Sequence, residues 1–133
     1  MVINVGALKD KKYDYVKNDI HTLKEVCGSD IVLKVIIETC LLTDEEKVKA
    51  CELAKEAGAD FVKSSTGFYT GGPCVGATEE VVAIMMENTE GKAKVKGSGC
   101  IRTREHFLKL IDMGIDRMGI GYKSTPIVLG LSK

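Results

Sequence analysis

The stretch Gly58–Lys63, GADFVK, decides the fold because a close copy of it, GIDRMG, returns at Gly114–Gly119. Both copies begin with a glycine that ends a helix pattern, and both continue through a small or apolar residue and an aspartate into a short strand. The copies are 56 residues apart, which corresponds to two units of about 28 residues. A repeated strand–helix unit predicts parallel strands that are covered by helices.

Strand and helix patterns alternate along the rest of the chain. Strands are expected at five places, over residues 1–5, 31–38, 60–65, 92–99 and 116–121. Helices are expected between them, over residues 13–27, 43–57, 78–88 and 103–113, with a closing helical turn at 124–129. The first and last long helices should bury one face each, formed by Tyr13, Val16, Ile20, Leu23 and Cys27, and by Phe107, Leu110 and Ile111.

Local signals support these helix boundaries. Thr43 to Glu46, TDEE, is a capping box at a helix start, and Gly58 is a glycine of the kind that ends a helix. Thr103 caps a later helix, and Pro126 suits the first position of the closing turn.

The regular spacing favours a (β/α) barrel over an open doubly wound sheet, which would show a Gly-x-Gly-x-x-Gly turn after its first strand. A closed barrel needs eight strands and roughly 200 residues or more. We therefore expect an α/β fold that is a partial (β/α)8 TIM barrel of about five βα units, with the three N-terminal units absent. Residues 1–133 would form a single, incomplete barrel domain.

Composition narrows the class of protein. The 133 residues carry 19 basic and 19 acidic side chains, which argues against a protein that binds nucleic acid or a membrane surface through its charge. No apolar run approaches the roughly 20 residues of a membrane span. The first ten residues do not resemble a signal peptide, so we expect a cytoplasmic protein.

Cysteine and histidine give no sign of a metal site. The five cysteines are scattered without a Cys-x-x-Cys pair, which indicates reduced thiols and argues against zinc: Cys27, Cys40, Cys51, Cys74 and Cys100. His21 and His106 lie in helix patterns without a second ligand nearby in sequence, so we interpret both as structural histidines.

Lysines stand inside the predicted strands, and Lys34, Lys63 and Lys96 are expected at matching depths. Because side chains alternate along a strand, Val62 and Val95 suit the side that faces the helices. The lysines then point inward, near the carboxyl ends of the strands, where barrels of this type carry their chemistry.

Two interpretations of Lys63 and Lys96 stay open on spacing alone. Burial and mutual repulsion both favour the neutral amine, which is a nucleophile toward carbonyl groups. Alternatively, each lysine reaches solvent or pairs with a carboxylate such as Glu38.

Glycine-rich turns end the same strands, in STG after Lys63, GSG after Lys96 and GIG at the last strand. Exposed backbone amides in such turns can cradle a phosphate, although any one of them alone is ordinary turn chemistry. Three turns at corresponding strand ends indicate an anion site.

These residues carry a resemblance to a known family. The segment KVIIETCLLTDEEKVKACELAKEAGADFVKSSTGF (34–68), followed by VKGSGCIRT (95–103), resembles the 2-deoxyribose-5-phosphate aldolases. The resemblance runs from residue 1 to about residue 120. It implies a (β/α)8 fold and a class I lyase that needs no metal or other cofactor and uses a Schiff base.

The resemblance also implies roles for individual residues. Lys63 matches the Schiff-base lysine, and Lys96 matches the second lysine that perturbs it and helps to move protons. Phosphate-binding loops are matched by four glycines: Gly67, Gly99, Gly119 and Gly121. The implied reaction cleaves 2-deoxy-D-ribose 5-phosphate to D-glyceraldehyde 3-phosphate and acetaldehyde, in deoxyribonucleotide catabolism.

The sequence departs from the family pattern at three places. The family's acid/base aspartate precedes the stretch that matches MVIN, and here Met1 opens that stretch. A Gly-Gly pair is replaced by Gly99-Cys100. The serines of the last strand are replaced by Tyr122-Lys123-Ser124, where Lys123 could supply charge and Tyr122 could crowd the site.

Several functions remain open on the sequence. The chain is expected to bind a small phosphorylated sugar or aldehyde, and to form a homo-oligomer or associate with a missing N-terminal half. One alternative is a non-catalytic remnant that acts as an interaction module. Another is a Schiff-base aldolase of the transaldolase type.

Overall fold

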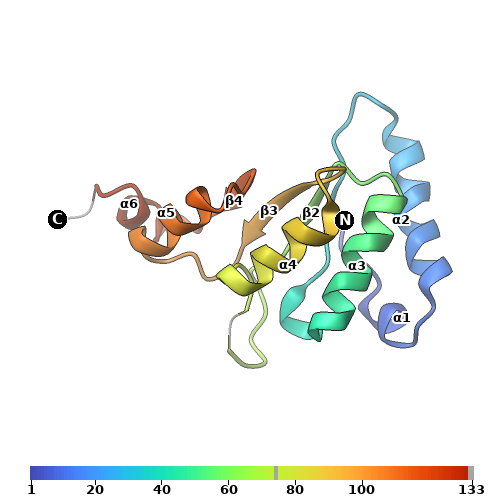
Figure 1. Cartoon of the computed structure of the whole chain (residues 1–133), viewed down its shortest axis with the longest axis horizontal. Helices are drawn as coiled ribbons and strands as arrows, with labels where there is room; N and C mark the ends of the chain where they lie inside the picture. Colours follow the sequence, from blue (N-terminus) through green and yellow to red (C-terminus); the bar gives the residue numbers. More distant parts are fainter. Residues whose placement is uncertain (74, 132–133) are drawn as a thin grey trace.

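Helices and strands alternate along the chain in a computed structural model, which describes residues 1–73 and 75–131 (Figure 1). The elements are α1 (Val5–Lys9), α2 (Tyr13–Cys27), β1 (Lys34–Ile36), a 3-10 turn η1 (Thr39–Leu41), α3 (Asp44–Glu56), β2 (Phe61–Lys63), α4 (Glu79–Thr89), β3 (Lys94–Ser98), α5 (Arg104–Asp112), β4 (Arg117–Gly119) and α6 (Thr125–Val128). The predicted order of strands and helices is confirmed from residue 13 onward.

The four strands form one parallel sheet in the order β1-β2-β3-β4, which is also their order in the chain. The expected first strand is wrong as a full strand, since Val2 makes only a single parallel bridge to Ile36. Its extended stretch is short because Asn4 caps α1, accepting a hydrogen bond from the Ala7 N–H at 2.9 Å. The sheet therefore has four strands and a one-residue bridge at the β1 edge.

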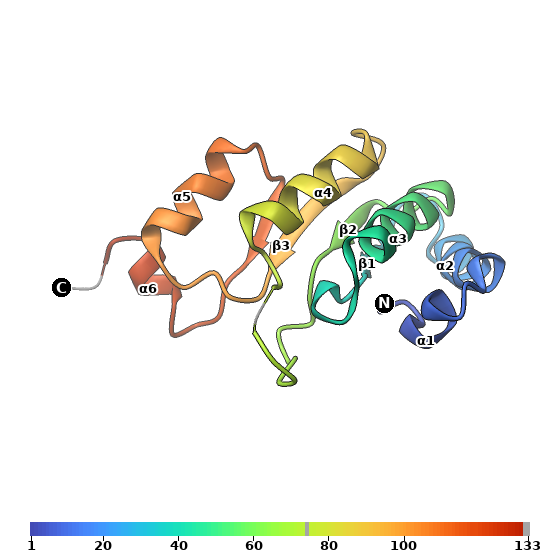
Figure 2. The same cartoon turned by 60° about the horizontal axis from the view of Figure 1, so that its bottom comes forward.

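The helices α3, α4 and α5 lie along one face of the sheet (Figure 2). That face is apolar, with Val35, Val62 and Val95 fully or almost fully buried, as the alternation of side chains predicts. The opposite face of the sheet carries the lysines.

The helix boundaries follow the signals in the sequence. The Thr43 hydroxyl and the Glu46 carboxylate form both bonds of the capping box at the start of α3. Gly58 and Gly114 follow the ends of α3 and α5 in left-handed conformations, with φ of 87° and 88°, which an L side chain rarely adopts.

The repeated aspartate has the same contact in both copies. Asp60 Oδ2 accepts a hydrogen bond from the Leu33 N–H at 2.7 Å, and Asp116 Oδ2 accepts one from the Val95 N–H at 2.8 Å. Each carboxylate thus ties the start of its strand to the neighbouring strand, which confirms that the two stretches are equivalent parts of a repeat.

The apolar core divides into two clusters. The larger cluster joins α1, α2, α3 and part of α4 to the first three strands, and the smaller one is formed by Ala77, Val82, Ile101, Leu110 and Val128. Met86 and Ile115 pack against both clusters. Two predicted core positions are wrong: Leu23 is 37% exposed and Ile111 is 48% exposed.

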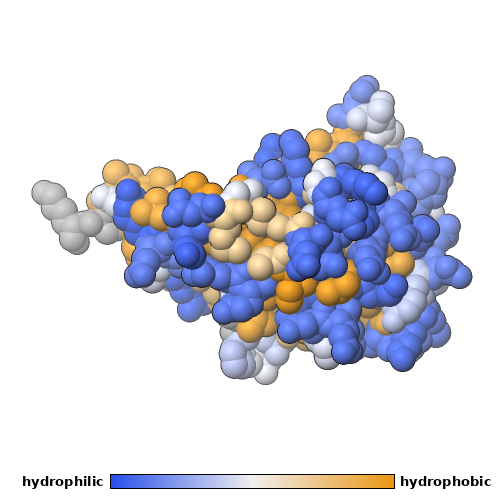
Figure 3. Space-filling model, in the orientation of Figure 1, coloured by the Kyte–Doolittle hydropathy of each residue, from blue (hydrophilic) through white to orange (hydrophobic). Residues whose placement is uncertain are grey.

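The surface of the helix-covered face is uneven in polarity. It is mostly hydrophilic over α2 and α3, whereas apolar side chains gather toward α5 and α6 (Figure 3). Exposed apolar residues of that part are Leu108, Ile111, Ile127, Leu129 and Leu131. None of the helices in residues 1–73 and 75–131 is long and apolar enough to cross a membrane.

The cysteines differ in state. Cys27, Cys40 and Cys51 are free, and burial raises the pKa of the Cys51 thiol to about 12. The Cys51 thiol therefore stays protonated at neutral pH and is unreactive. The expectation of reduced thiols is wrong for Cys100, which is disulfide-bonded, while Cys74 lies outside the described residues.

Candidate active site

Two lysines meet side by side on the open face of the sheet. Lys63 of β2 is the register partner of Lys96 of β3, and Lys96 is in turn the partner of Arg117 of β4. The expectation that Lys34 lies at the same depth is wrong, because Lys34 pairs with Phe61, two residues before Lys63. Of the three lysines, only Lys63 and Lys96 therefore share a level near the carboxyl ends of the strands.

Below this level, Phe61 is surrounded by cations. The residue is only 4% exposed, and the cationic groups of Lys34, Lys94 and Arg117 lie 5.0 to 5.8 Å from the centroid of its ring. Together with Lys63 and Lys96, five cations occupy the open face. Among the described residues, no salt bridge joins any of the five to a carboxylate.

Burial and the crowding of cations change the pKa of the Lys96 amine. Burial lowers the pKa of the Lys96 amine below its usual range, and the charges of Lys63, Lys34 and Arg117 lower it further. Lys96 is half-buried, and so is Lys63, which is less buried than the sequence predicted. The open alternative of a lysine–Glu38 pair is not found, because Glu38 binds Thr66 instead.

Three buried serines lock the ends of β2 and β3 together. The Ser64 hydroxyl donates to the Ser98 carbonyl at 2.8 Å and accepts from the Ser98 N–H at 2.9 Å. The Ser98 hydroxyl donates to the carbonyl of Ser65. These bonds hold Lys63 and Lys96, which precede the serines, in a fixed mutual position.

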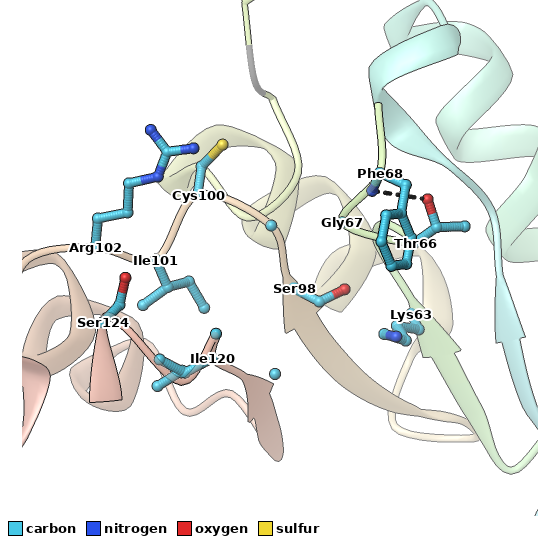
Figure 4. A pocket seen from close by; sticks show the side chains of 13 residues that line it. Lys63, Thr66, Gly67, Phe68, Ser98, Cys100, Ile101, Arg102, Ile120 and Ser124 are labelled. Atoms are coloured by element: carbon cyan, nitrogen blue, oxygen red, sulfur yellow. Dashed lines mark hydrogen bonds between the residues drawn. The ribbon is translucent and has the colours of Figure 1, made fainter. Parts of the chain in front are cut away.

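Lys63 lines an open cavity of about 400 Å³ at the carboxyl ends of β2, β3 and β4 (Figure 4). All four predicted glycines also line it: Gly67, Gly99, Gly119 and Gly121. Lys96 does not line the cavity directly. It lies against its β4 wall, since a Cβ at Gly119 would be 3.3 Å from Lys96 Cε.

The glycines contribute in different ways. Gly67 and Gly99 have φ of 82° and 86°, so these turns need glycine for their backbone conformation. A Cβ at Gly119 would be 3.2 Å from that of Ser98, so a side chain there would have to displace Ser98 by a few tenths of an ångström. Gly121 has free space around it and no such constraint. Cys100 adopts a left-handed conformation with φ of 64° at a position where the family pattern has a second glycine.

Sequence reasoning missed several residues of the cavity, among them Arg102, Ser124, Thr66 and Phe68. Arg102 and Ser124 lie across the cavity from Thr66 and Phe68 (Figure 4). The signal for Arg102 was a cation three residues after Gly99, close to a predicted anion-binding turn.

The expected crowding by Tyr122 is not found. Tyr122 is 82% exposed, and the Lys123 ammonium lies 5.9 Å from the centroid of its ring. Neither residue lines the cavity. Ser124 is therefore the residue of this turn that faces the site.

The predicted structural role of the histidines agrees with their contacts. His106 Nε2 lies 2.7 Å from the Ala77 carbonyl oxygen, and His21 lies 3.2 Å from Glu25 on the surface of α2. Among the described residues, no cluster of three or more His, Cys, Asp or Glu side chains could hold a metal ion.

Comparison with known proteins gives matches over nearly the whole chain. The family model described as DeoC/LacD family aldolase matches residues 1–124. Two curated relatives named deoxyribose-phosphate aldolase, from Clostridium tetani and Thermococcus kodakarensis, are 56% identical over 119 residues and 58% identical over 120 residues. Each alignment covers 90% of this chain but only 53% and 52% of the relatives. The chain thus spans about half the length of the curated relatives it matches.

Solved structures also match this chain over about half of their own length. A putative deoxyribose-phosphate aldolase from Coccidioides immitis superposes with a TM-score of 0.86 at 39% identity, covering 98% of this chain and 50% of that one. A deoxyribose phosphate aldolase from Aeropyrum pernix, described as having a unique tetrameric structure, gives a TM-score of 0.73 at 29% identity, covering 89% of this chain and 49% of that one. The chain has the fold of about half of such structures, which confirms the predicted partial α/β barrel.

Proposed function

The chain belongs to the DeoC/LacD family of aldolases, and from this premise we propose that it carries the Schiff-base chemistry of a deoxyribose-phosphate aldolase. The substrate would be 2-deoxy-D-ribose 5-phosphate, cleaved to D-glyceraldehyde 3-phosphate and acetaldehyde. The predicted cytoplasmic location and the role in deoxyribonucleotide catabolism belong to the same proposal.

The position of Lys63 is the observation that carries this proposal. Its amine lines the cavity at the strand ends, and the Lys96 amine stands beside it in register. In the proposed reaction, the neutral Lys63 amine adds to the C1 aldehyde and loses water to form an iminium ion. The C2–C3 bond then breaks, its electron pair moves into the iminium to give an enamine, and the C3 hydroxyl loses its proton.

Lys96 is the proposed acceptor of that proton, through one water molecule, because its side chain lies against the β4 wall and does not line the cavity. Its lowered pKa increases the fraction of neutral amine at working pH, and a neutral amine is a general base. Protonation of the enamine and hydrolysis of the resulting imine would then release acetaldehyde and regenerate Lys63.

The phosphate would lie at the opposite wall of the cavity. Arg102 supplies a positive charge there, and the Ser124 hydroxyl and the turns at Gly99 and Gly119–Gly121 supply hydrogen-bond donors. Gly67 lies on the Lys63 side of the cavity, and its N–H already donates to the Ser65 hydroxyl at 3.0 Å, so its turn would border the phosphate without donating to it. An arginine can bind phosphate through two parallel N–H bonds, which fixes the orientation of the substrate as well as its position.

Reductive trapping tests the proposal. The chain, together with the strands that complete its barrel where these come from another segment, is incubated with acetaldehyde and a hydride reductant, and digested for mass spectrometry. We expect an N-ethyl group on Lys63, because the hydride reduces the iminium before it hydrolyses. Lys63→Met should abolish the fast adduct, whereas Lys94→Met, which removes an exposed lysine from the same face, should retain it.

Two outcomes would count against the proposal. Adducts spread evenly over surface lysines would identify a non-catalytic chain that serves as an interaction module. Trapping at Lys63 by dihydroxyacetone but not by acetaldehyde would favour an aldolase of the transaldolase type.

The assembly of the site is also part of the proposal. We propose that residues 1–133 act as one incomplete barrel domain that functions in association with further strands, either from other copies or from another segment. The open cationic face of the sheet supports this, since a barrel of this type encloses that face.

A further inference from the structure

Glu38 has an unusual backbone conformation beside the lysine site. It follows β1 and has φ of 54° and ψ of 65°, in the left-handed region that a glutamate rarely occupies. The neighbouring backbone is fixed on both sides, since the Ile37 N–H donates to the Lys63 carbonyl at 2.9 Å and the Thr39 N–H donates to the Ser64 carbonyl at 2.8 Å. The strain is therefore imposed next to the strand that carries Lys63.

The side chain of Glu38 is also unusual. It is only 7% exposed, and its two carboxylate oxygens differ in their contacts. Oε2 accepts hydrogen bonds from the Thr66 hydroxyl at 2.6 Å and the Thr66 N–H at 3.3 Å. Oε1 is buried without a hydrogen-bond partner in the part of the chain that the structure describes.

Neither feature stabilises the fold. A non-glycine residue held in a sparsely populated conformation destabilises the fold. A buried acceptor without a partner adds the cost of its lost hydration. Such costs concentrate at functional sites, and the short Glu38–Thr66 contact points to the function that Glu38 serves.

Thr66 connects Glu38 to the cavity. The Thr66 hydroxyl gives its hydrogen to Glu38 and accepts a hydrogen bond from the Phe68 N–H at 3.2 Å. Both Thr66 and Phe68 line the cavity with Lys63 (Figure 4). With its only hydrogen committed, the hydroxyl can face a ligand only as an acceptor.

We propose that Glu38 is a positioning residue of the Lys63 site, which holds Thr66 so that its oxygen accepts a hydrogen bond from a hydroxyl group of the substrate. The inference rests on the proposed aldolase function. It predicts that Glu38 matters for hydroxylated aldehydes and much less for acetaldehyde, which has no hydroxyl group to donate.

The test compares trapping at Lys63 by 2-deoxyribose 5-phosphate and by acetaldehyde, together with unfolding in urea. Glu38→Gly removes the carboxylate and suits the left-handed backbone. We expect it to keep or raise the urea midpoint, to slow trapping by 2-deoxyribose 5-phosphate about tenfold or more, and to change trapping by acetaldehyde less than about threefold. Glu38→Gln keeps an acceptor of the same length and should restore most of the selectivity.

Glu90→Gly is the matched control. Glu90 is also a glutamate with a left-handed backbone, at φ of 52°, but it caps α4 far from the cavity lining and pairs with Lys55. The control should leave both trapping rates unchanged. Thr66→Val should reproduce the selectivity loss of Glu38→Gly, and the double variant should lose no more than either single variant.

The possible failures are distinguishable. If the unsubstituted chain, with its barrel completed, forms no adduct at Lys63, the proposed aldolase function is wrong and this inference falls with it. If the unsubstituted chain reacts and Glu38→Gly slows both aldehydes equally or neither, only the inference on Glu38 is overturned. It is likewise overturned if Thr66→Val is trapped by both aldehydes at the rates of the unsubstituted chain.

Discussion

Lys96 is a half-buried cation among other cations, so its charge should cost stability. Because its pKa is lowered in the folded chain, the unfolded chain binds more protons at alkaline pH, and the stability of the fold rises as pH increases toward the unfolded value near 10.4. Lys96→Met should be more stable than the unsubstituted chain at pH 7, and the difference should shrink by pH 10. Urea unfolding at several pH values measures it, and a difference that stays constant with pH would contradict the charge argument.

Arg102 allows a separate test of the phosphate wall. A hydrogen bond to a charged group is worth about 1.5–3 kcal/mol, so Arg102→Gln should raise the concentration of 2-deoxyribose 5-phosphate needed for half-maximal trapping roughly 10- to 100-fold. Trapping by unphosphorylated 2-deoxyribose is the internal control and should not change. Equal losses with both sugars would place the phosphate elsewhere.

At the scale of single elements, the repeated aspartates Asp60 and Asp116 can be compared, because each makes the same hydrogen bond at the start of its strand. Burial raises the pKa of Asp60, but the hydrogen bonds from Lys24 Nζ at 2.6 Å and the Leu33 N–H lower it more, so the net shift is downward. The stabilisation is thus complete above the unfolded value near 3.9 and is lost as pH falls through the folded value. Asp60→Asn should lower the free energy of unfolding at pH 7 by about 1–2 kcal/mol. The free energy of unfolding of this variant should also fall less steeply below pH 5 than that of the unsubstituted chain.

Asp116→Asn is the comparison within the same chain. Asp116 accepts the equivalent hydrogen bond from Val95, but no salt bridge to it is found in the described residues. An asparagine can still accept that bond, so the substitution should cost less than about 0.5 kcal/mol at pH 7. A loss as large as that of Asp60→Asn would show that Lys24 is not the source of the difference.

The elements also show which features can be predicted from sequence. The capping box at Thr43, the glycines that follow α3 and α5, and the alternation that separates Val62 from Lys63 all depend on contacts within a few residues. The level of Lys34 was missed because register between strands is set by neighbours distant in the chain. The strain at Glu38 left no signal at all, since it arises only when Ile37 and Thr39 bond to β2.

The candidate site was predictable to a similar degree. Lys63, Lys96 and the four glycines stand in motifs that can be recognised along one strand and its turn. Thr66, Arg102 and Ser124 become part of the same cavity only when three strand ends are brought together. Threonine and serine are common in surface loops, so nothing in the sequence set Thr66 and Ser124 apart. Arg102 had only the weak signal of a cation three residues after Gly99.

At the scale of the whole molecule, the sheet has an open side and an open edge. Five cations on the open face should repel the same face of a second copy, so face-to-face pairing of two chains is unfavourable. The outer edge of β4 has no partner strand among the described residues and presents free backbone groups that can pair with another chain. We expect light scattering to find species larger than a monomer. We also expect the chain alone to cleave 2-deoxyribose 5-phosphate more slowly than roughly 1 s⁻¹. A well-folded monomer that cleaves faster would refute this expectation.

The division of the core into two clusters has a consequence for partial unfolding. The smaller cluster holds α5 and α6 together with Ile101 and the neighbours of β4. It meets the larger cluster along α4, which contributes Val82 to the smaller cluster and Val81 and Met85 to the larger one, and through Met86 and Ile115. Such a unit can open while the rest stays native, so its amides should exchange with deuterium sooner than those of β1 and β2. Lys63 lies in the slowly exchanging part, whereas Arg102, Gly119 and Ser124 lie in the part that opens first. In mild denaturant the chain should therefore lose its binding of phosphate before it loses the reactive amine.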